Sequence, residues 1–504
     1  MDLQGRGLAI SELRVVGRGL APAERIKNFQ KLRMISRISE EELQKQREYA
    51  ARVRAAVETA AFERGAPLKF CVVTYGCQQN EADSERIAGM LFDMGYEKAD
   101  SENDADIILV NTCAVREHAE KRALSVTGQY KHLKEKNPAL MIGVCGCMVS
   151  QEHRLDDIKF RYPYVDFAFG TSYLWQLPSI IYDRMKKKKR LFLLDTEEHG
   201  NIAENLPVLR ECSYRAWLSV MYGCNNFCTY CVVPHVRGRE RSRYKEDIIK
   251  EAEALVKDGV KDITLLGQNV NSYGRGLYDD YGFPELLRDI NNIDGDFTLR
   301  FMTSHPKDAT KKLIDTMAEC KKIAPQLHLP LQAGSDRVLQ RMNRHYTLDS
   351  YKELVSYARE KIPGITLTSD IMVGFPGETE EDFEQTLKAL TDIKYDMVYS
   401  FIYSRRKNTP AAEYEDQIPE DVKGERFRRM LEVQSDIGLK INEGYIGKTV
   451  RVLCDGESKT DPDTLSGRTD GGKNICFTGK CAAGEYTKVK VTAARPFVLL
   501  GEEE

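Results

Sequence analysis

The strongest constraint on the fold is an alternation of short apolar runs with amphipathic stretches, which occurs in two separate series along the chain. The first series has apolar runs at residues 68–75, 106–111 and 140–145, each followed by a helix-like segment. Buried strands that alternate with helices are typical of βα units on a parallel sheet. The pattern therefore predicts an N-terminal parallel-sheet βα domain over residues 67–205.

The second series is longer and predicts a different architecture. Its helices include residues 244–257 and 379–390, and its strands are expected at residues 216–221, 262–266, 298–302, 326–329, 366–373 and 397–401. Six βα units are enough for a partial barrel and too few for a closed eight-fold barrel. We therefore expect an α/β protein with a central partial (βα)6 barrel over residues 206–440.

The two ends of the chain differ from these series. Residues 1–66 are expected to form a helical or flexible extension, because residues 40–64 are rich in Glu, Gln, Arg and Ala, which favour a solvated helix. The last segment, residues 441–504, is punctuated by glycine and has β-like runs at residues 449–455, 473–477 and 486–494. This segment predicts a small β-barrel.

Composition separates the chain from the disulfide-rich secreted class. It has 504 residues, 13 cysteines and a formal net charge of −3 at pH 7. It contains no run of about eighteen apolar residues, and residues 1–30 lack the apolar core of a secretory signal. We therefore expect a cytoplasmic protein without a membrane span, in which clustered cysteines bind metal or carry out chemistry. The charge balance gives no indication of a nucleic-acid partner.

Three cysteines follow the first strand of the second series with the spacing CxxxCxxC: Cys224, Cys228 and Cys231. A turn after Gly223 can direct all three thiolates to one cluster. A four-iron cluster normally takes four thiolates, so three leave one iron open to the amino and carboxylate groups of S-adenosylmethionine (SAM). A zinc site completed by His235 and a chance set of core cysteines are the alternatives. Phe227 and Tyr230 in the loop favour a cluster sheltered from water.

A second set of three cysteines lies just past the ends of three strands in the first series: Cys77, Cys113 and Cys147. Ligands bind at the carboxyl edge of open parallel sheets, so these thiolates can converge although they are far apart in sequence. Cys71 and Cys145 fall inside strands, where a buried cysteine is the ordinary case. We interpret the remaining cysteines as structural or incidental: Cys71, Cys145, Cys212, Cys320, Cys454, Cys476 and Cys481.

The CxxxCxxC loop after the first strand of a partial barrel resembles that of the radical SAM superfamily. The resemblance implies that a reduced 4Fe–4S cluster cleaves SAM to methionine and a 5′-deoxyadenosyl radical, which removes hydrogen from unactivated C–H bonds. It also implies SAM-binding residues at two strand ends: Gly267, Gln268 and Asn269 near the methionine end, and Gly374, Gly377 and Glu378 near the adenosine end. Plain turns are the alternative, because glycine is common where strands end.

The segments around the first three cysteines resemble the N-terminal domain of the methylthiotransferase family. These segments are residues 76–80, 111–113 and 146–148. The resemblance covers residues 68–500 and implies a second 4Fe–4S cluster on Cys77, Cys113 and Cys147, and an RNA-binding TRAM domain at the C-terminal β-barrel. Gln79 stands where the family often has methionine, which is not a ligand position.

Within this family the chain resembles the branch that acts on isopentenylated adenosine in tRNA. Residues 222–243, 267–274 and 303–306 carry this resemblance, and residues 328–335, 341–344, 401–404 and 409–412 fit the family in general. Residues 405–408 depart from the small Pro/Gly-containing link of the family, which affects the expected loop shape. The alternatives are the branches acting on threonylcarbamoyl adenosine or on an aspartate of a ribosomal protein, and a non-catalytic Fe–S RNA-binding protein.

The resemblance implies a reaction that replaces the hydrogen at carbon 2 of adenine by a methylthio group. That hydrogen is not acidic, so we expect no catalytic side chain beyond the cluster ligands. Two SAM molecules are implied per product: one donates a methyl to sulfur on the N-terminal cluster, and the other supplies the radical. The implied partners of a monomeric enzyme are the tRNA anticodon loop, a flavodoxin or ferredoxin as reductant, and an Fe–S assembly or sulfur donor.

Four arginines follow the CxxxCxxC loop: Arg237, Arg239, Arg241 and Arg243. Guanidinium groups form bidentate contacts with phosphates, and such contacts dominate nucleic-acid affinity. We therefore expect at least one of them to contact tRNA. Binding of the SAM carboxylate and pairing with Glu240 are the alternatives.

Overall fold

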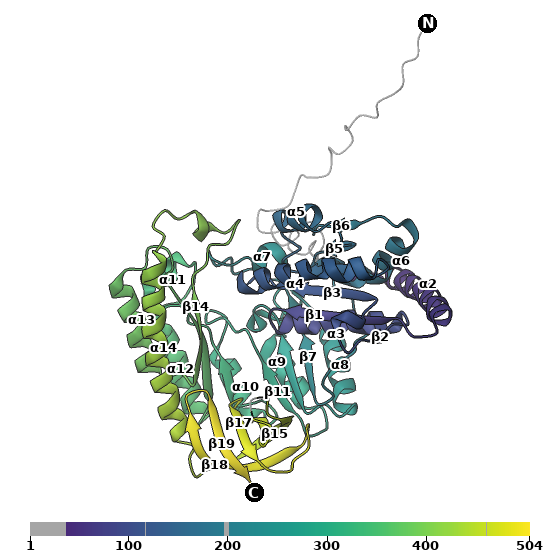
Figure 1. Cartoon of the computed structure of the whole chain (residues 1–504). Helices are drawn as coiled ribbons and strands as arrows, with labels where there is room; N and C mark the ends of the chain where they lie inside the picture. Colours follow the sequence, from purple (N-terminus) through teal and green to yellow (C-terminus); the bar gives the residue numbers. More distant parts are fainter. Residues whose placement is uncertain (1–36, 116, 196–200, 460) are drawn as a thin grey trace, which may run out of the picture.

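The computed structural model of the chain describes residues 37–115, 117–195, 201–459 and 461–504, and it has three parts with different architectures (Figure 1). An N-terminal α/β domain, coloured purple to blue, lies beside a central barrel of strands and helices, coloured teal to green. A yellow C-terminal β-barrel lies against one end of the central part. Residues 1–36 of the predicted extension lie outside the described residues.

The N-terminal domain is built on a six-stranded sheet in which all neighbouring strands are parallel. The order along the sheet is β2 (Glu97–Lys98), β1 (Lys69–Tyr75), β3 (Ile107–Thr112), β4 (Met141–Gly146), β5 (Phe167–Phe169) and β6 (Leu191–Leu193). The predictions for β1, β3 and β4 are confirmed within one residue at each end. They missed β2, β5 and β6, because runs of two or three residues are too short to give a periodic signal.

Side chains of the central strands alternate between two apolar cores. Ile107 and Leu109 of β3 pack on one side with α3 (Gln78–Asp93) and α6 (Leu177–Lys187). Ile108 and Val110 pack on the other side with α4 (Glu117–Lys136) and α5 (Glu152–Arg161). Every residue of β3 is therefore buried, which explains the unbroken apolar run that predicted a parallel sheet.

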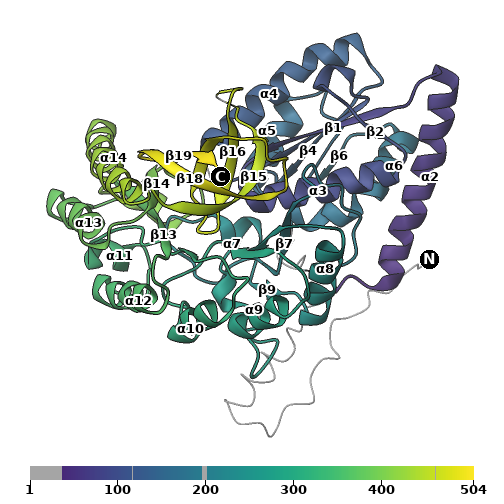
Figure 2. The ribbon, with the colours of Figure 1, turned by 90° about the horizontal axis from the view of Figure 1, so that it is seen from below.

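Helix α2 spans Glu40–Arg64, which confirms the helix predicted for this segment. The helix is not solvated on all sides, because it packs along α6 at the edge of the N-terminal domain (Figure 2). Its buried residues are Leu43, Ala50, Val53 and Val57. They form a narrow apolar stripe on a largely charged helix, so composition alone did not reveal the buried face.

The central part contains six parallel strands in two sheets of three. One sheet has the order β11 (Thr298–Phe301), β10 (Asp262–Leu266), β7 (Arg215–Ser219), and the other β12 (Gln326–His328), β13 (Thr366–Val373), β14 (Met397–Ile402). A β-bridge between Leu299 and Ile323 connects β11 to the segment that leads into β12. Strands β7 and β14 stand at the two ends of this row, so the barrel is open, as six βα units predicted.

Helices cover the outside of the open barrel (Figure 2). They are α8 (Lys245–Lys257), α9 (Phe283–Asn291), α10 (Lys311–Glu319), α11 (Asp336–Arg341), α12 (Leu348–Lys361), α13 (Glu380–Ile393) and α14 (Glu420–Glu443). The first barrel strand was predicted to reach residue 221, but it ends at Ser219. The next strand, β8 (Met221–Tyr222), pairs with β9 (Arg241–Ser242) in an antiparallel ladder instead. This ladder closes the base of the loop that carries the CxxxCxxC cysteines.

The C-terminal segment forms a closed five-stranded barrel, which confirms the predicted β-barrel. The strand order is β15 (Thr449–Glu457), β16 (Leu465–Thr469), β17 (Asn474–Thr478), β19 (Val498–Glu503), β18 (Tyr486–Arg495). The sequence prediction missed β16 and β19, in which polar residues and glycine interrupt the apolar pattern. Across the described parts of the chain, no helix has the length and apolar character needed to cross a membrane.

A buried arginine attaches the C-terminal barrel to the central part. Arg300 of β11 pairs with Asp262 at 2.9 Å, and its other nitrogens donate to the carbonyls of Thr469 and Asp470 at 3.1 and 2.8 Å. These carbonyls lie at the end of β16 and in the turn that leads to β17. Asp262 begins β10, so the C-terminal barrel covers the amino ends of the barrel strands and leaves their carboxyl ends to the other side (Figure 1).

We expect Arg300→Met to lower the free energy of unfolding by about 3–5 kcal/mol, because it leaves the buried Asp262 carboxylate unpaired. Chemical denaturation measures this loss. The matched control is Arg288→Met, which breaks a solvent-exposed pair with Glu319 and should cost less than about 1 kcal/mol. Equal losses in the two variants would contradict the docking role of Arg300.

Candidate functional site

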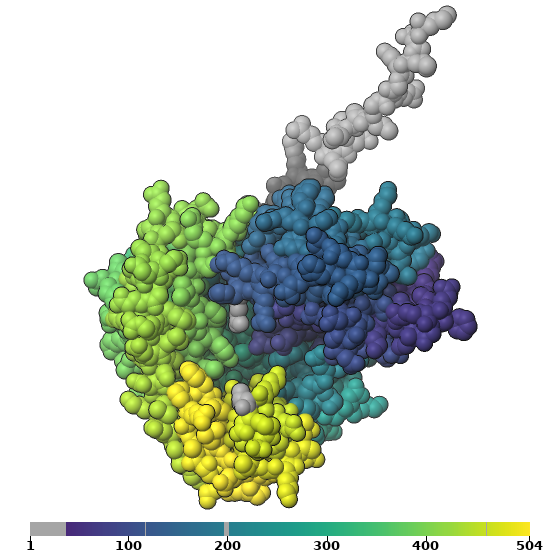
Figure 3. Space-filling view, in the orientation of Figure 1, coloured from purple at the N-terminus to yellow at the C-terminus, as the bar shows by residue number. Residues whose placement is uncertain are grey.

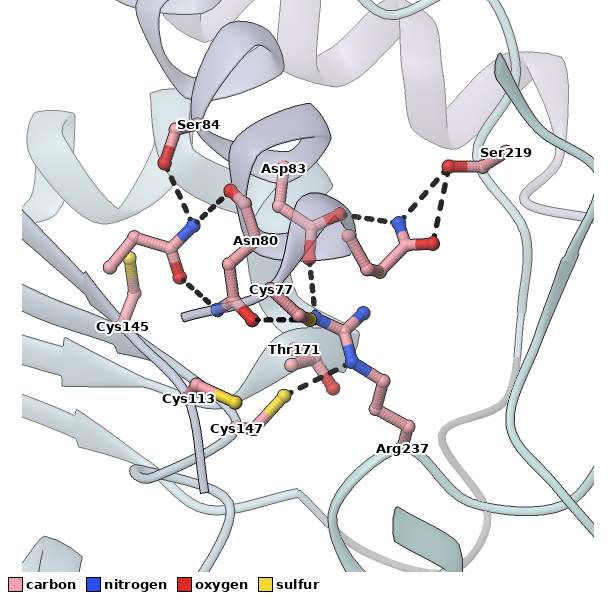
Figure 4. Close-up of polar contacts among 12 residues, drawn as sticks. Cys77, Asn80, Asp83, Ser84, Cys113, Cys145, Cys147, Thr171, Ser219 and Arg237 are labelled. Atoms are coloured by element: carbon pink, nitrogen blue, oxygen red, sulfur yellow. Dashed lines mark hydrogen bonds and ion pairs between the residues drawn. The ribbon is translucent and has the colours of Figure 1, made fainter. Parts of the chain in front are cut away.

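The three N-terminal cysteines stand at the carboxyl ends of neighbouring strands. Cys77 follows β1, Cys113 follows β3 and Cys147 follows β4, and these strands are adjacent in the sheet. Figure 4 shows the three side chains gathered beside the guanidinium of Arg237. Gly76 permits this approach, since a Cβ at that position would lie 2.6 Å from the Cβ of Cys113. The fold therefore brings together three cysteines that are far apart in sequence.

A buried amide network fixes the two strand ends that carry Cys77 and Cys113. Asn80 Nδ2 donates to Asn111 Oδ1 and to the carbonyl of Thr112, both at 3.0 Å. In return, Asn111 Nδ2 donates to the carbonyl of Asn80 at 2.8 Å. The segments 76–80 and 111–113, which carried the family resemblance, thus hold each other in place.

Close contact and burial change the acidity of these thiols. A hydrogen bond from the Cys113 thiol lowers the pKa of Cys77 to about 6, and the same contact raises the pKa of Cys113. Burial raises the pKa of Cys147 to about 11, and the adjacent Arg237 guanidinium opposes that increase. Metal ligation requires thiolates, so binding of a metal centre here would release protons.

The CxxxCxxC loop is held by its own backbone and by a second loop. The side-chain amide of Asn343 donates to the carbonyls of Asn226 and Phe227 at 3.2 and 3.0 Å. Gly223 turns the chain into the loop with φ 73°, and a Cβ there would lie 2.1 Å from the carbonyl oxygen of Arg239. The loop therefore has little freedom to rearrange.

The three thiols of this loop face a buried environment. Burial raises the pKa of Cys224 to about 11 and that of Cys231 to about 12, and proximity to Cys228 adds to both increases. Arg344 Nη1 lies 3.6 Å from the sulfur of Cys228. Sequence analysis did not identify Arg344 or Asn343 as site residues. The available signal was the stretch 341–344, which was interpreted only as a family feature.

The donor sets fit an iron–sulfur cluster better than zinc. His235, which would complete a zinc site, is exposed on the short helix α7 (Val233–Val236). Within the described ranges, no three His, Cys, Asp or Glu side chains are arranged to hold one metal ion. In a cluster each thiolate binds a different iron, so the sulfur atoms stand further apart than the ligands of one ion. Three thiolates in each set match a cluster with one open iron.

Helix α7 joins the two cysteine sets. It begins two residues after Cys231, and Val232 and Val236 form a buried apolar cluster with Ala114 and Cys147. Figure 1 shows α7 between the N-terminal domain and the barrel. Helix α7 therefore lies between the carboxyl edge of the N-terminal sheet and the carboxyl end of the barrel.

The segment after β14 makes a second contact between the barrel and the N-terminal domain. Ser404 donates to the Glu117 carboxylate at 2.6 Å, and Arg406 donates to the carbonyl of Val115 at 2.9 Å and lies 3.4 Å from Glu120. Residues 405–408, which depart from the family pattern, thus reach the segment that follows Cys113. Figure 3 shows a hollow bordered by the N-terminal domain, the second half of the barrel and the C-terminal barrel.

Five buried polar atoms at the carboxyl ends of β10 and β11 have no hydrogen-bond partner among the described residues. They are Gln268 Oε1, Asn269 Oδ1, Asn271 Nδ2, Ser304 Oγ and His305 Nε2. Buried polar groups normally have partners, so a group of unpaired atoms marks a place for a polar ligand. Sequence analysis identified Gln268 and Asn269 but missed Ser304 and His305, which stood in a stretch interpreted only as a branch feature.

His305 offers its ring Nε2–H as a hydrogen-bond donor to a ligand bound among these unpaired atoms. Its Nδ1 accepts a hydrogen bond from the amide of Lys307 at 3.2 Å, and burial lowers the pKa of His305 to about 2. The ring is therefore neutral, and this hydrogen bond assigns its proton to Nε2. Gly267 packs against Met221, which stands just before the cysteine loop. Donors and acceptors next to that loop fit a polar cofactor such as SAM.

The other predicted SAM segment has partners inside the protein. The Gly374 amide donates to the Glu378 carboxylate, and Arg426 of α14 pairs with that carboxylate, both at 2.8 Å. Burial raises the pKa of Glu378 to about 7, and these two hydrogen bonds oppose the increase. The Gly377 amide donates to the carbonyl of Asp416 at 2.8 Å. These contacts describe a well-held turn, which was the alternative interpretation, and adenosine binding here stays a prediction.

Two of the four predicted RNA-binding arginines are committed to internal ion pairs. Arg237 and Arg243 are 8% and 4% exposed. Arg243 pairs with Glu204 and Glu251 at 2.6 and 2.8 Å. Burial and pairing leave Arg237 and Arg243 little guanidinium surface for a phosphate, and contact between at least one arginine of this run and tRNA stays a prediction.

The other two arginines differ from each other. Arg241 Nη1 donates to the carbonyls of Arg237 and Arg239, so it supports the turn before β9. Arg239 is exposed, and its guanidinium lies 4.4 Å from the centre of the Phe227 ring. Arg239 is therefore the most exposed arginine of this run and the one most open to a phosphate.

Comparisons with known proteins match all three parts of the chain. Residues 69–170 match the family model described as Uncharacterized protein family UPF0004, residues 218–390 the Radical SAM superfamily, and residues 443–502 the TRAM domain. Among solved structures, a radical S-adenosylmethionine methyltransferase from Kitasatospora setae gives a TM-score of 0.49 at 14% identity, covering 77% of this chain and 79% of that chain.

Curated relatives cover most of the chain. A protein of Clostridium perfringens named tRNA-2-methylthio-N(6)-dimethylallyladenosine synthase is 49% identical over 434 residues, which are 86% of this chain and 97% of that protein. A protein of Acetivibrio thermocellus with the same name is 46% identical over 466 residues, which are 92% of this chain and 97% of that protein. At this identity and coverage, the chain belongs to the family of the tRNA-2-methylthio-N(6)-dimethylallyladenosine synthases, which are radical SAM methylthiotransferases.

Proposed function

We propose that this chain adds a methylthio group to carbon 2 of N6-isopentenyladenosine next to the anticodon of tRNA, with two SAM molecules and two 4Fe–4S clusters. N6-isopentenyladenosine is the dimethylallyladenosine in the name of the relatives. The observation that supports the proposal is that helix α7, which follows one set of three cysteines, packs on Cys147 of the other set. One cluster is enough to generate a radical, so the second set matches the additional task of transferring sulfur.

The two cysteine sets have different tasks in this proposal. Cys224, Cys228 and Cys231 would hold the cluster that, together with SAM, supplies the radical needed to remove a non-acidic hydrogen. Cys77, Cys113 and Cys147 would hold the cluster whose open iron takes sulfur. The unpaired atoms of Gln268, Asn269 and His305 would bind and orient SAM beside the first set. The apolar cluster of Val232, Val236 and Ala114 would keep water out between the sets.

The substrate side of the proposal rests on the family and on the C-terminal barrel. The TRAM match at residues 443–502 and the exposed Arg239 support contact with RNA. A base in an anticodon loop is exposed, so its unstacking costs little. We include in the proposal a cytoplasmic monomer, a flavodoxin or ferredoxin as reductant, and an Fe–S assembly or sulfur donor.

Two cysteine variants separate the tasks. Cys228→Ala should abolish the reductive cleavage of SAM to 5′-deoxyadenosine and keep about half of the bound iron, because one cluster site stays intact. Cys113→Ala should also keep about half of the iron and still cleave SAM, but form no methylthio product. Iron analysis and chromatography of the nucleoside products measure these outcomes.

The matched control for both variants is Cys320→Ala. Cys320 is 6% exposed and lies at the end of α10, outside both sets. This variant should keep all of the iron and both reactions. A Cys113→Ala protein that still forms methylthio product would contradict the sulfur-transfer task of the N-terminal set.

Analysis of tRNA nucleosides tests the substrate. Transfer RNA from cells that lack the protein should contain N6-isopentenyladenosine without the methylthio group, and complementation should restore the modified nucleoside. Mass spectrometry of digested tRNA measures both. A change confined to threonylcarbamoyl adenosine, or to an aspartate of a ribosomal protein, would assign the chain to another branch.

A glycine pair tests whether the geometry of the cysteine loop decides iron binding. Gly223→Ala should remove about half of the iron, because its Cβ would collide with the carbonyl of Arg239 and displace the loop. Gly276→Ala is the control: Gly276 has φ 76°, close to that of Gly223, but nothing lies within 4 Å of an added Cβ. An equal loss of iron in the two variants would show that backbone strain, not the loop position, governs the effect, and no loss in either would show that the loop tolerates the added Cβ.

A further inference from the structure

The side chain of Arg237 crosses from the barrel to the N-terminal cysteines. Arg237 directly follows helix α7 and stands six positions after Cys231. Its Nε donates to the sulfur of Cys147 at 3.0 Å, and its Nη2 pairs with Asp83 of α3 at 2.8 Å. Figure 4 shows the guanidinium between these two partners. One residue therefore belongs to the loop of one cysteine set and touches a sulfur of the other set.

The position of this guanidinium is fixed from several sides. Asp83 accepts a hydrogen bond from Gln79 Nε2 at 3.2 Å, and the same nitrogen donates to Ser219 at the end of β7 at 3.0 Å. On the other side, Thr171 donates to the carbonyl of Val236 at 3.1 Å. Arg237 is 8% exposed and Asp83 is 5% exposed, so water does not screen their charges.

We propose that Arg237 is a positioning residue that orients the Cys147 thiolate and sets the reduction potential of the cluster on the N-terminal set, with Asp83 as the opposing charge. The inference rests on the proposed function, because it requires a cluster on Cys77, Cys113 and Cys147. It goes further, because it assigns a task to a residue that is not a ligand.

The physical basis is the charge of the buried thiolates. A buried negative centre is unfavourable unless a positive charge or hydrogen bonds compensate it. Hydrogen bonds to the sulfurs of a cluster, and the charge around it, set its reduction potential. Arg237 supplies both, so it favours the reduced cluster, which carries one more negative charge. Asp83 reduces this effect, because its carboxylate lies beside the same guanidinium.

The set of Cys224, Cys228 and Cys231 has a different arrangement, so the inference applies to the N-terminal set only. Arg344 approaches Cys228 at 3.6 Å, and it donates to the carbonyl of Pro330 and to the hydroxyl of Tyr346. In the described part of the chain, Arg344 has no carboxylate partner. Asp83 therefore offsets positive charge beside the N-terminal set, from Arg237 at 2.8 Å and from Arg86 at 3.6 Å, whereas Arg344 brings a full positive charge to the set of Cys224, Cys228 and Cys231.

The test uses full-length protein in which Cys224, Cys228 and Cys231 are replaced by alanine, so that only the N-terminal set can hold a cluster. Each variant is reconstituted with iron and sulfide without oxygen, and its midpoint potential is measured by a titration followed by electron paramagnetic resonance. Arg237→Met should shift the potential to a more negative value, because the donor and the positive charge are lost. Asp83→Asn should shift it to a more positive value, because the guanidinium is no longer offset.

Two further variants separate tuning from structural damage. Arg237→Lys keeps the charge without the guanidinium fork, so its potential should lie between those of the parent and Arg237→Met. Arg243→Met removes a buried, paired arginine that contacts neither set, and it should leave the potential unchanged. If Arg237→Met does not retain iron, the shift in Asp83→Asn still decides, because that variant keeps the donor to Cys147.

The outcomes distinguish this inference from the function on which it rests. A parent protein without iron would overturn the N-terminal cluster itself, and the inference with it. Iron retained in Asp83→Asn and Arg237→Met at an unchanged potential would overturn the inference alone. Shifts of the same sign in both variants would also overturn it, since damage to the packing, and not charge, would then explain them.

Discussion

All strands of a parallel βα sheet end at one edge, and this protein contains two such edges that meet at helix α7. The rest of the site depends on this meeting. Cys77, Cys113 and Cys147 come from three separate βα units, and only the parallel order of β1, β3 and β4 places them side by side. The other set needs no such assembly, because a single loop carries it. The apolar cluster that Val236 forms with Cys147 then packs the helix after that loop against the N-terminal set.

Because these sulfurs are buried, the negative charge of their thiolates needs compensation by positive side chains or hydrogen bonds. Each set has one buried arginine within reach of a sulfur, Arg237 at Cys147 and Arg344 at Cys228. The arginine run after the CxxxCxxC loop therefore serves the interior more than the surface. Two of its four members, Arg237 and Arg243, bind carboxylates of other elements. The net charge of −3 agrees with this use, because arginines that pair with buried carboxylates add no positive charge to the surface.

Much of this architecture could be predicted from sequence, because buried parallel strands leave unbroken apolar runs. The runs for β1, β3 and β4 were found within one residue, and the cysteines just past them followed from the same pattern. Cys71 and Cys145, which the same pattern separates from that set, lie inside strands β1 and β4 and contribute to the apolar cores.

What sequence could not show were contacts between segments far apart. The buried stripe of α2, the unpaired Nε2 of His305 and the approach of Arg344 to Cys228 all depend on tertiary packing. The burial of Arg237 and Arg243 could not be predicted for the same reason. A guanidinium that binds phosphate and one that binds a buried carboxylate leave the same letters in the sequence.

An open barrel needs something to span its two free edges at the carboxyl end, and the N-terminal domain does this. Strands β7 and β14 are the outer strands of the row. Ser219, at the end of β7, binds Gln79 of α3, and Ser404, just past β14, binds Glu117 at the start of α4. Helix α3 begins one residue after Cys77, and α4 begins four residues after Cys113. The same elements that present the N-terminal thiols therefore also hold the two edges of the barrel.

This double use explains the one loop that departs from the family pattern. Arg406 lies in the segment 405–408, where the family has a small link. Its long side chain donates to the carbonyl of Val115 and lies beside Glu120, so it reaches the segment after Cys113. The C-terminal barrel, held by Arg300 at the amino ends of the strands, stays clear of this contact. The C-terminal barrel and the N-terminal domain thus contact opposite ends of the barrel strands, and Figure 3 shows a hollow between these parts.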